Sequence, residues 1–347
     1  MRNPKTLFTS RARVCARREP APHAGCAGAQ KGRFELTAFE NSLYLSGHIL
    51  TPATPMTRPL RSMLFVSGER ADRYPKALAS GADLACIDLE DAVHPSRKAQ
   101  ARLSVCEFIA GYAPKPGDAQ LAVRINAIGT ADGLRDVLAL QDSGARMDYL
   151  IVPKVQDPVE LSLVECWLPH AFRHLVALIE TPQGMQRAAD IGAAVRAAAP
   201  RVSALMLGGA DLSMELGAQF NWTGLLGARA ALVMAAKASG LQAWDVPFIH
   251  IDDVPGLRQE TGLALQMGFD CKTAIHPSQV APIHECFAPA PQELAWAQGL
   301  QEAMDAQGGP AQIRGAFVYQ GKLVDAPIIK RASRILATAA LLRRNEQ

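Results

Sequence analysis

Short runs of apolar and β-branched residues recur along the chain from residue 58 onward. Continuous apolar runs of this length are typical of parallel strands that are covered on both faces. The runs are SMLFVSG (62–68), LACIDLE (84–90), QLAVRIN (120–126), DYLIVPK (148–154), HLVALIE (174–180), VSALMLGG (202–209), QAWDVPF (242–248) and DCKTAIHP (270–277). The stretches between them, such as 187–199 and 228–239, have the alanine content and apolar spacing of covering helices.

Eight strand–helix units in about 290 residues predict an α/β fold of the (β/α)8 TIM-barrel type. The alternative is an open doubly wound sheet, which carries a Gly-rich G-x-G-x-x-G turn after its first strand. Here the first run leads into SGERADRYPK, which lacks that pattern, so the barrel is favoured. We expect the barrel over residues 58–285 and a C-terminal helical extension over residues 286–347.

Composition and charge exclude several other classes of protein. No stretch approaches 18 uninterrupted apolar residues, which argues against a membrane-spanning helix. The seven cysteines include no C-x-x-C pair, so a disulfide framework or a thiolate zinc site is not expected, and a cytoplasmic location fits best. Residues 58–347 hold 28 basic and 30 acidic groups, which argues against a nucleic-acid-binding surface.

Residues 1–57 differ from the rest of the chain because they contain eight Lys/Arg and only three Glu. This arginine-rich start is compatible with a mitochondrial transit peptide, which would place the protein in the mitochondrial matrix. The alternatives are a disordered tail, or translated upstream sequence with the true start at Met56. On each interpretation, residues 1–57 are expected to be a disordered extension outside the folded core.

Polar side chains follow nearly every predicted strand, at the end where the active sites of such barrels lie. The strand ends in chain order are Ser67–Gly68, Asp88/Glu90/Asp91, Arg124/Asn126, Lys154, Glu180, Asp211, Asp245 and His276. One charged strand end is a routine way to leave a core, but a whole ring of them on one face favours an active site.

Two carboxylates of this ring, Glu180 and Asp211, follow consecutive strands and can converge on one ion. An all-oxygen pair of this kind suits Mg²⁺, with water and substrate oxygens completing the coordination. The alternative is structural: Asp211 caps a helix starting at Leu212, and Glu180 pairs with Arg124 or Lys154.

The acidic group of Asp88, Glu90 and Asp91 requires a compensating positive charge, for which Arg124 and Lys154 are the candidates. Arg124 offers a planar set of donors suited to an oxyanion. We interpret the acids as groups that orient metal-bound water and the arginine, and include Asp88 among the candidate catalytic residues. His276 before a proline is more often structural, and Cys86 is expected to be a small buried hydrophobic residue.

The ordered motifs RSMLFVSGERADRYPKALASGADLACIDLEDAV, VRIN, VPKV, IETPQGM, GGADLSMELG, GFDCKTAIHPSQV and GAFVYQGKLVDAPIIKRA carry a resemblance. Over residues 58–340 the chain resembles the HpcH/HpaI aldolase–citrate lyase β-subunit superfamily, in particular its malyl-CoA and citramalyl-CoA lyase-like branch. The resemblance implies a Mg²⁺-dependent carbon–carbon lyase acting on an acyl-CoA and a small 2-keto acid, assembled as a homotrimer or hexamer.

The resemblance also implies roles for individual residues. The metal ligands fall on Glu180 and Asp211, and the arginine that meets the thioester enolate falls on Arg124. Positions that contact coenzyme A fall on Phe65, Arg70 and Lys76, although Ser67 replaces the usual proline of that motif. Asp325 matches an acid that the C-terminal extension delivers as part of a lid into a neighbouring subunit; by sequence pattern alone, it would be a surface turn residue after Gly321.

Three functions compete at this point. The first is a lyase that cleaves or forms a 3-hydroxyacyl-CoA such as citramalyl-CoA or malyl-CoA, with pyruvate or glyoxylate and acetyl-CoA as the other partners. The second is a CoA-independent, metal-dependent pyruvate aldolase, and the third is a citrate lyase β-type subunit or non-catalytic partner. The basic residues Arg70 and Lys76 and the tail with Asp325 favour the first.

Overall fold

The computed structural model describes residues 60–194, 199–306 and 316–345. The expected N-terminal extension over residues 1–57 lies outside these ranges. Among the described residues, no helix has the length and apolar character needed to cross a membrane.

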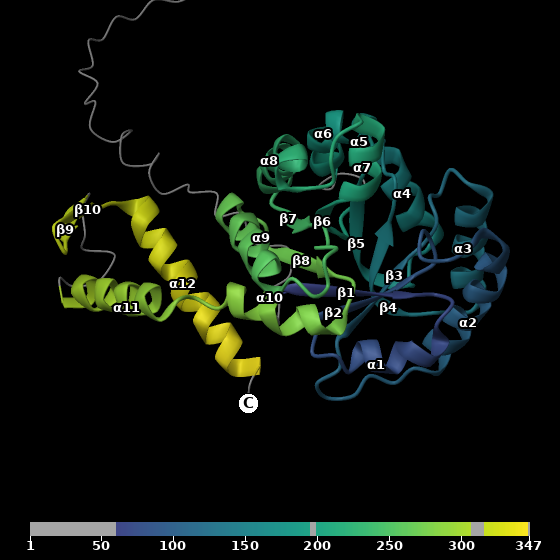
Figure 1. Ribbon diagram of the computed structural model, residues 1–347, viewed down its shortest axis with the longest axis horizontal. Coiled ribbons are helices and arrows are strands. Elements are labelled where there is room, and N and C mark those ends of the chain that lie inside the picture. Colours follow the sequence, from purple (N-terminus) through teal and green to yellow (C-terminus); the bar gives the residue numbers. More distant parts are fainter. Residues whose placement is uncertain (1–59, 195–198, 307–315, 346–347) are drawn as a thin grey trace, which may run out of the picture. The chain divides into compact units, whose positions relative to one another are not determined.

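Within the described ranges, eight parallel strands close into a barrel in which each strand pairs with the next and β8 pairs with β1 (Figure 1). The strands are β1 (Ser62–Ser67), β2 (Leu84–Asp88), β3 (Gln120–Arg124), β4 (Met147–Val152), β5 (Phe172–Ile179), β6 (Val202–Leu207), β7 (Gln242–Asp245) and β8 (Cys271–Ala274). Each falls on one of the eight apolar runs. The predicted TIM barrel is therefore confirmed.

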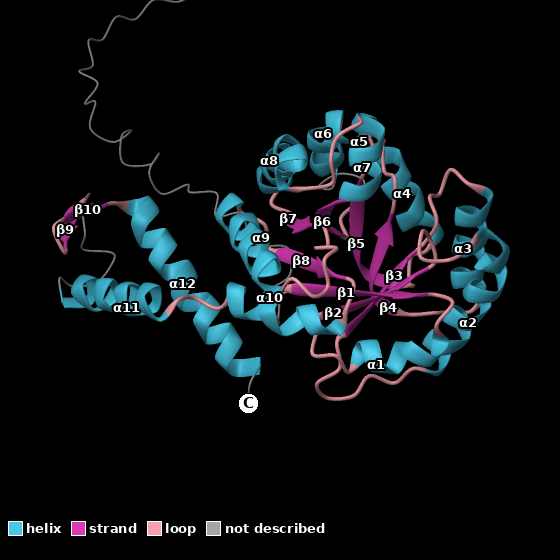
Figure 2. Cartoon of the chain, in the orientation of Figure 1, coloured by secondary structure: helices cyan, strands magenta, loops and turns pink. Residues whose placement is uncertain are grey.

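Helices alternate with the strands and cover the barrel (Figure 2). They are α1 (Tyr74–Leu78), α2 (Lys98–Gly111), α3 (Ala131–Asp142), α4 (Pro158–Trp167), α5 (Pro182–Gln186), α6 (Ala188–Ala194), α7 (Gly209–Leu216), α8 (Trp222–Ala238), α9 (Val254–Met267) and α10 (Val280–Phe287), with 3-10 turns η1 (Ala71–Arg73), η2 (Pro95–Arg97) and η3 (Pro277–Gln279). Polar residues fix several helix starts: Thr130, Thr181 and Asn221 each accept a backbone N–H of the first turn.

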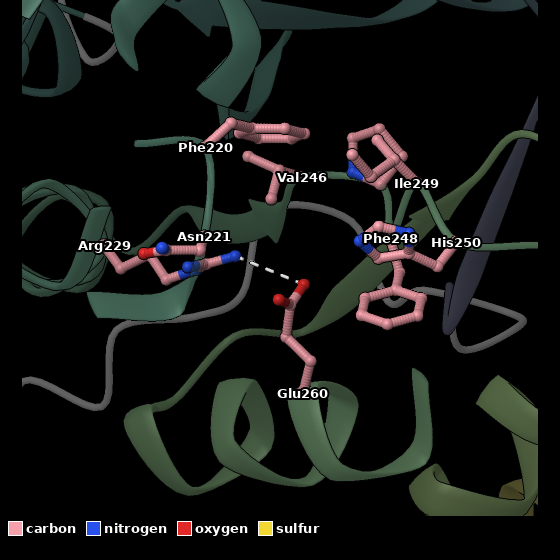
Figure 3. A pocket seen from close by; sticks show the side chains of 9 residues that line it. Phe220, Asn221, Arg229, Val246, Phe248, Ile249, His250 and Glu260 are labelled. Carbon is pink, nitrogen blue, oxygen red and sulfur yellow. Dashed lines mark hydrogen bonds and ion pairs between the residues drawn. The ribbon is translucent and has the colours of Figure 1, made fainter. Parts of the chain in front are cut away.

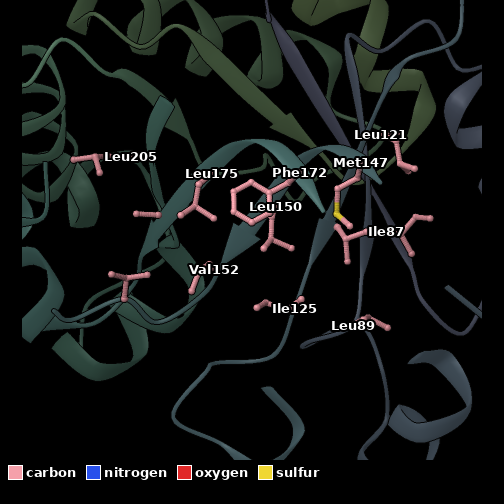
Figure 4. Close-up of a cluster of buried hydrophobic side chains, with 14 of the residues drawn as sticks. Ile87, Leu89, Leu121, Ile125, Met147, Leu150, Val152, Phe172, Leu175 and Leu205 are labelled. Atoms are coloured by element: carbon pink, nitrogen blue, oxygen red, sulfur yellow. The ribbon is translucent and has the colours of Figure 1, made fainter. Parts of the chain in front are cut away.

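Side chains alternate between two apolar layers along each strand, as the pleat requires. One layer fills the barrel interior with residues from every strand: Met63, Leu84, Cys86, Ala122, Tyr149, Ile151, Val176, Leu178, Ala204, Met206, Trp244 and Cys271. The intervening residues, such as Ile87, Leu121 and Leu150, pack outward against the helices (Figure 4). Cys86 is fully buried, as expected.

The C-terminal extension forms an apolar cluster of its own. It comprises α11 (Pro291–Ala306), the antiparallel hairpin β9 (Phe317–Tyr319) and β10 (Lys322–Val324), and α12 (Ala326–Asn345). Ala297, Leu300, Met304, Val324 and Ala332 make its buried core. The helical character of the extension is confirmed, while its role as a lid for a neighbouring subunit stays a prediction.

Candidate active site

The strand alternation brings several predicted site residues to the mouth of the barrel. Phe65, Asp88, Arg124 and Glu180 each lie two residues beyond a side chain of the barrel interior, on β1, β2, β3 and directly after β5. Since residues two apart in a strand share a face, these four point toward the barrel axis. Asp88 and Arg124 are also direct neighbours in the strand register.

Arg124 is held in place by Asp88. Its Nε and Nη2 donate to the two carboxylate oxygens of Asp88 at 2.7 and 2.6 Å. Asp88 also accepts the backbone N–H groups of Glu90 and Ala92, so its oxygens are fully engaged. Burial alone would lower the pKa of Arg124, but the nearby carboxylates of Asp88 and Glu90 outweigh it and raise the pKa. Asp88 is thus a positioning group for a permanently charged Arg124, whose Nη1 lies 3.1 Å from Glu90 Oε2.

Lys154 follows β4 and connects the remaining acids. Its backbone has a φ of 55°, a left-handed conformation that costs a non-glycine residue about 1–2 kcal/mol. In this conformation its N–H donates to Glu180 Oε1 at 2.9 Å. Its Nζ lies 2.6 Å from Asp211 Oδ2, 2.8 Å from Glu90 Oε1 and 3.7 Å from Glu180 Oε1. Glu180 and Asp211 therefore converge on one cationic group.

Glu180 is almost fully buried, with 3% of its surface exposed. Burial, followed by the negative charge of Glu90, raises the pKa of Glu180 to about 8. Gly208, directly after β6, makes room for this carboxylate: a Cβ there would lie 2.3 Å from both Cβ and Oε2 of Glu180. The glycine is required by this close approach.

Asp211 lies in the first turn of α7, which begins at Gly209 with Gly208 at its N-cap and no side-chain cap. The alternative in which Asp211 caps a helix starting at Leu212 is therefore wrong. The other half of that alternative, a pairing of Glu180 with Lys154, is present.

The charges at the mouth do not balance. We call Asp88, Glu90, Asp91, Arg124, Lys154, Glu180 and Asp211 the mouth cluster. It contains five carboxylates and two cations. One buried carboxylate oxygen, Glu90 Oε2, has no hydrogen-bond partner among the residues that the structure describes, because its approach to Arg124 has ion-pair distance without hydrogen-bond alignment. A divalent cation would supply the missing charge.

The donor set fits magnesium better than a softer metal. Among the described residues, no group of three or more His, Cys, Asp or Glu side chains is arranged to hold a metal. Two carboxylates, Glu180 and Asp211, leave most coordination positions to water and substrate oxygens, which is the arrangement that Mg²⁺ accepts. These two residues are the ones that would hold the ion.

Comparison with known proteins agrees with this geometry. Residues 61–277, more than half of the chain, match the family described as HpcH/HpaI aldolase/citrate lyase. The chain belongs to the HpcH/HpaI aldolase/citrate lyase family.

The relatives of this HpcH/HpaI chain include named lyases. An L-malyl-CoA/beta-methylmalyl-CoA lyase of Cereibacter sphaeroides is 34% identical over 318 residues, covering 83% of this chain and 97% of that protein. The mitochondrial citramalyl-CoA lyase of Rattus norvegicus is 29% identical, covering 82% and 87%. The structure of CitE from Mycobacterium tuberculosis in complex with magnesium, acetoacetate and coenzyme A is 31% identical and has a TM-score of 0.69, covering 82% of this chain and 100% of that chain.

A groove beside the mouth cluster contains the residues expected to contact coenzyme A in this HpcH/HpaI protein. It has a volume of about 500 Å³ and is lined by Phe65, Arg70, Lys76 and also Arg73, which the sequence analysis missed. The Phe65 ring lies 5.0 Å from Arg124 Cζ, so this side chain links the groove to the mouth cluster. A cluster of three basic residues in the first strand–helix unit was visible in the sequence and would have identified Arg73.

Ser67, which replaces the usual proline, connects two loops at this groove. Its Oγ donates to the carbonyl oxygen of Ala92 at 2.5 Å, in the acidic loop after β2. His276 also lines the groove, but it caps the 3-10 turn η3, with Nδ1 2.7 Å from Ser278 Oγ. This is the structural role expected for it.

Asp325 directly precedes α12 and is exposed. Its Oδ1 accepts the N–H of Ile328 at 3.4 Å, which is a helix-capping contact. Within the single chain it is an exposed residue at the start of a helix, and its catalytic role remains a prediction.

Asp245 is a strand end that does not belong to the mouth. It is fully buried and follows Trp244, an interior residue, so it faces outward toward the helices. Arg229 of α8 and Lys272 of β8 pair with it at 2.8 and 2.6 Å, and both also approach Glu260 of α9. We call Arg229, Asp245, Glu260 and Lys272 the outer cluster; Figure 3 shows Arg229 and Glu260 at the edge of a small pocket. The inclusion of Asp245 in the ring of active-site candidates was wrong, because the pleat turns its side chain away from the barrel axis.

Proposed function

We propose that the protein is a magnesium-dependent lyase that cleaves a 3-hydroxyacyl-CoA, such as citramalyl-CoA or malyl-CoA, into acetyl-CoA and pyruvate or glyoxylate. The observation that carries this proposal is the convergence of Glu180 and Asp211 on one cationic group, next to Arg124. The names of the relatives support the same substrate class.

The reaction is a retro-aldol cleavage. The hydroxyl group gives its proton to water, its oxygen becomes the carbonyl oxygen of the keto acid as the carbon–carbon bond breaks, and the electron pair of that bond passes to the thioester, which becomes an enolate. Magnesium, when bound, supplies Lewis-acid polarisation of the oxygens that bind it. Arg124 stabilises the enolate oxygen, because Asp88 fixes its guanidinium before the charge develops. Asp325 then delivers a proton to the enolate carbon.

The groove supports a CoA thioester over a free aldehyde. Arg70, Arg73 and Lys76 bring positive charge to this cavity, where Asp72 pairs with Arg70, and Phe65, whose ring lies 5.0 Å from Arg124 Cζ, also lines it. Phosphate groups of coenzyme A need cations of this kind, whereas a CoA-independent aldolase does not.

A catalytic role for Asp325 requires an assembly of several chains, because we propose that it acts in the site of a neighbouring copy. We propose a homotrimer or hexamer, which the family resemblance supports. A cytoplasmic location, or a mitochondrial one if residues 1–57 act as a transit peptide, also remains a proposal.

The decisive experiment is a substrate panel. Purified protein is incubated with Mg²⁺ and malyl-, citramalyl-, methylmalyl- or citryl-CoA, and the released keto acid is measured. We expect cleavage of at least one thioester, lost on addition of EDTA. Cleavage of CoA-free hydroxy-keto acids alone would support the pyruvate aldolase instead, and EDTA-resistant cleavage would contradict the metal assignment.

Replacing Asp325 by Asn tests the proton transfer. We expect exchange of deuterium into acetyl-CoA to fall by about 10²–10⁴-fold, the usual contribution of general acid–base catalysis. Binding of coenzyme A, measured by calorimetry, should change little. Unaltered exchange in a correctly assembled Asp325→Asn variant would exclude this role.

A further inference from the structure

Lys154 forms ion pairs with both candidate metal ligands, Glu180 and Asp211. Within residues 60–194, 199–306 and 316–345, it is the one positively charged side chain that forms an ion pair with either Glu180 or Asp211. Arg124, the other cation of the mouth cluster, pairs with the acids of the loop after β2.

The backbone of Lys154 also contacts one of the two candidate metal ligands. A lysine rarely adopts a left-handed conformation, and strain of this kind persists where the surroundings impose it. Here it allows the N–H to donate to Glu180 Oε1 while the side chain of the same residue reaches Asp211. One residue therefore fixes the orientation of one ligand and draws the other toward it.

The ammonium of Lys154 lies between the two carboxylates, with Nζ 2.6 Å from Asp211 Oδ2 and 3.7 Å from Glu180 Oε1. A metal ion bound by these two oxygens would compete with it for the same charge. The side chain has other partners, because it is one-third exposed and its Nζ also lies 2.8 Å from Glu90 Oε1 and 3.8 Å from Asp91 Oδ1.

We propose that the Lys154 ammonium competes with a divalent cation for Glu180 and Asp211: it keeps the two carboxylates together before the ion binds, and it withdraws to the Glu90–Asp91 side when the ion enters. Lys154 is then a positioning residue that sets the metal affinity. This inference rests on the metal-dependent lyase proposed above.

Metal binding by a Lys154→Met variant tests the competition. Mn²⁺ alone is titrated into the full-length protein, and the free ion is measured by electron paramagnetic resonance. Removing the ammonium should tighten Mn²⁺ binding by about tenfold, the factor expected for loss of a competing charge-assisted contact.

Lys98→Met is the matched control, because it removes the same charge beside the same acidic loop. Its Nζ donates to the carbonyl oxygens of Leu89 and Glu90 and has no ion pair with Glu180 or Asp211 among the described residues. Its effect on Mn²⁺ affinity should be less than about twofold. Equal tightening in both variants would mean that general charge, not competition, is responsible, and unchanged or weaker binding in Lys154→Met would overturn the proposal.

Wild-type protein provides a second test that needs no folded variant. Lysines are acetylated with N-hydroxysuccinimidyl acetate and the sites are quantified by mass spectrometry. Mg²⁺ should increase acetylation of Lys154 severalfold and leave Lys98 unchanged; a decrease or no change at Lys154 would overturn the inference. If wild-type protein binds neither Mn²⁺ nor Mg²⁺, both the competition and the proposed magnesium-dependent lyase function are wrong. If it binds the ion but Lys154 has no effect, only the competition is wrong.

Discussion

The mouth cluster and the outer cluster both contain buried charged side chains, but their charge balance differs. The outer cluster pairs two cations with two carboxylates, whereas the mouth cluster sets two cations against five carboxylates. The charges of the outer cluster cancel. The mouth cluster has an excess of negative charge, which a bound cation would offset.

The pKa values of two acids express this difference. Burial would raise the pKa of Asp245, but Lys272 and Arg229 outweigh it and the pKa is lowered. Glu180 is buried to a similar degree, and burial together with Glu90 raises its pKa to about 8 despite Lys154. The positive charge near Glu180 is too small to offset its burial, and a buried carboxylate of this kind in a cleft is a candidate for a binding site.

The largest contrast is expected in turnover. Glu180→Gln and Asp211→Asn should each reduce Mg²⁺-dependent cleavage by about a thousandfold or more, because metal polarisation is worth several kcal/mol of barrier. Glu260→Gln makes the same change in the outer cluster and should leave the rate within about threefold of wild type. The rates are measured on whichever CoA thioester of the substrate panel the wild-type protein cleaves. Comparable losses of rate in all three variants would contradict the distinction between the two clusters.

The free energy of unfolding should depend strongly on the outer cluster. Lys272→Met leaves Asp245 and Glu260 with too little positive charge, and we expect the free energy of unfolding to fall by about 3–5 kcal/mol. Lys237→Met breaks the exposed pair with Asp270 and should cost about 0–1 kcal/mol. Denaturant unfolding measures both. A loss below about 1 kcal/mol for Lys272→Met would show that the outer cluster is not a structural element.

A third expected effect is a pH dependence of the stability of the metal-free protein. With a pKa of about 8 in the folded state against about 4.3 in the unfolded chain, Glu180 binds more protons when folded. Stability therefore falls as pH rises between these values, and the high pKa of Glu90 acts in the same direction. The rise in melting temperature caused by Mg²⁺ should be larger at about pH 8.5 than at about pH 6, because the ion needs the carboxylate.

Glu180→Gln serves as the control for that measurement. It should flatten the decline in melting temperature across the same pH range, since glutamine does not titrate. A wild-type melting temperature that rises steadily from about pH 5 to 8 would contradict the raised pKa.

The sequence was sufficient for the fold and for much of the site. Eight apolar runs marked eight strands, and the polar residues that follow them marked the mouth. Glu180 and Asp245 face opposite sides of the sheet because of their positions along the strands. Glu180 lies two residues after the interior Leu178, whereas Asp245 lies one residue after the interior Trp244. That rule can be applied to a sequence once an interior residue such as Leu178 or Trp244 is recognised.

Other features depend on contacts that are distant in the sequence. In its left-handed conformation, the backbone N–H of Lys154 donates to Glu180, 26 residues later in the chain. No local sequence pattern, such as a glycine at this position, predicts that conformation. Arg229 lies in the middle of an alanine-rich helix, and Lys272 within a strand, so each looked like an ordinary member of its element. The pairing of β7 with β8 and the packing of α8 on β7 bring them to Asp245.

Gly208 shows how an inactive relative could arise without any obvious sign. A single methyl group at this position would displace the Glu180 carboxylate, although every acid, arginine and lysine of the mouth cluster would still be present. Such a protein would fold, match the family and carry a complete set of ligands, yet hold no ion. Checks on whether a homologue has kept its chemistry should therefore begin with this small residue before counting the charged ones.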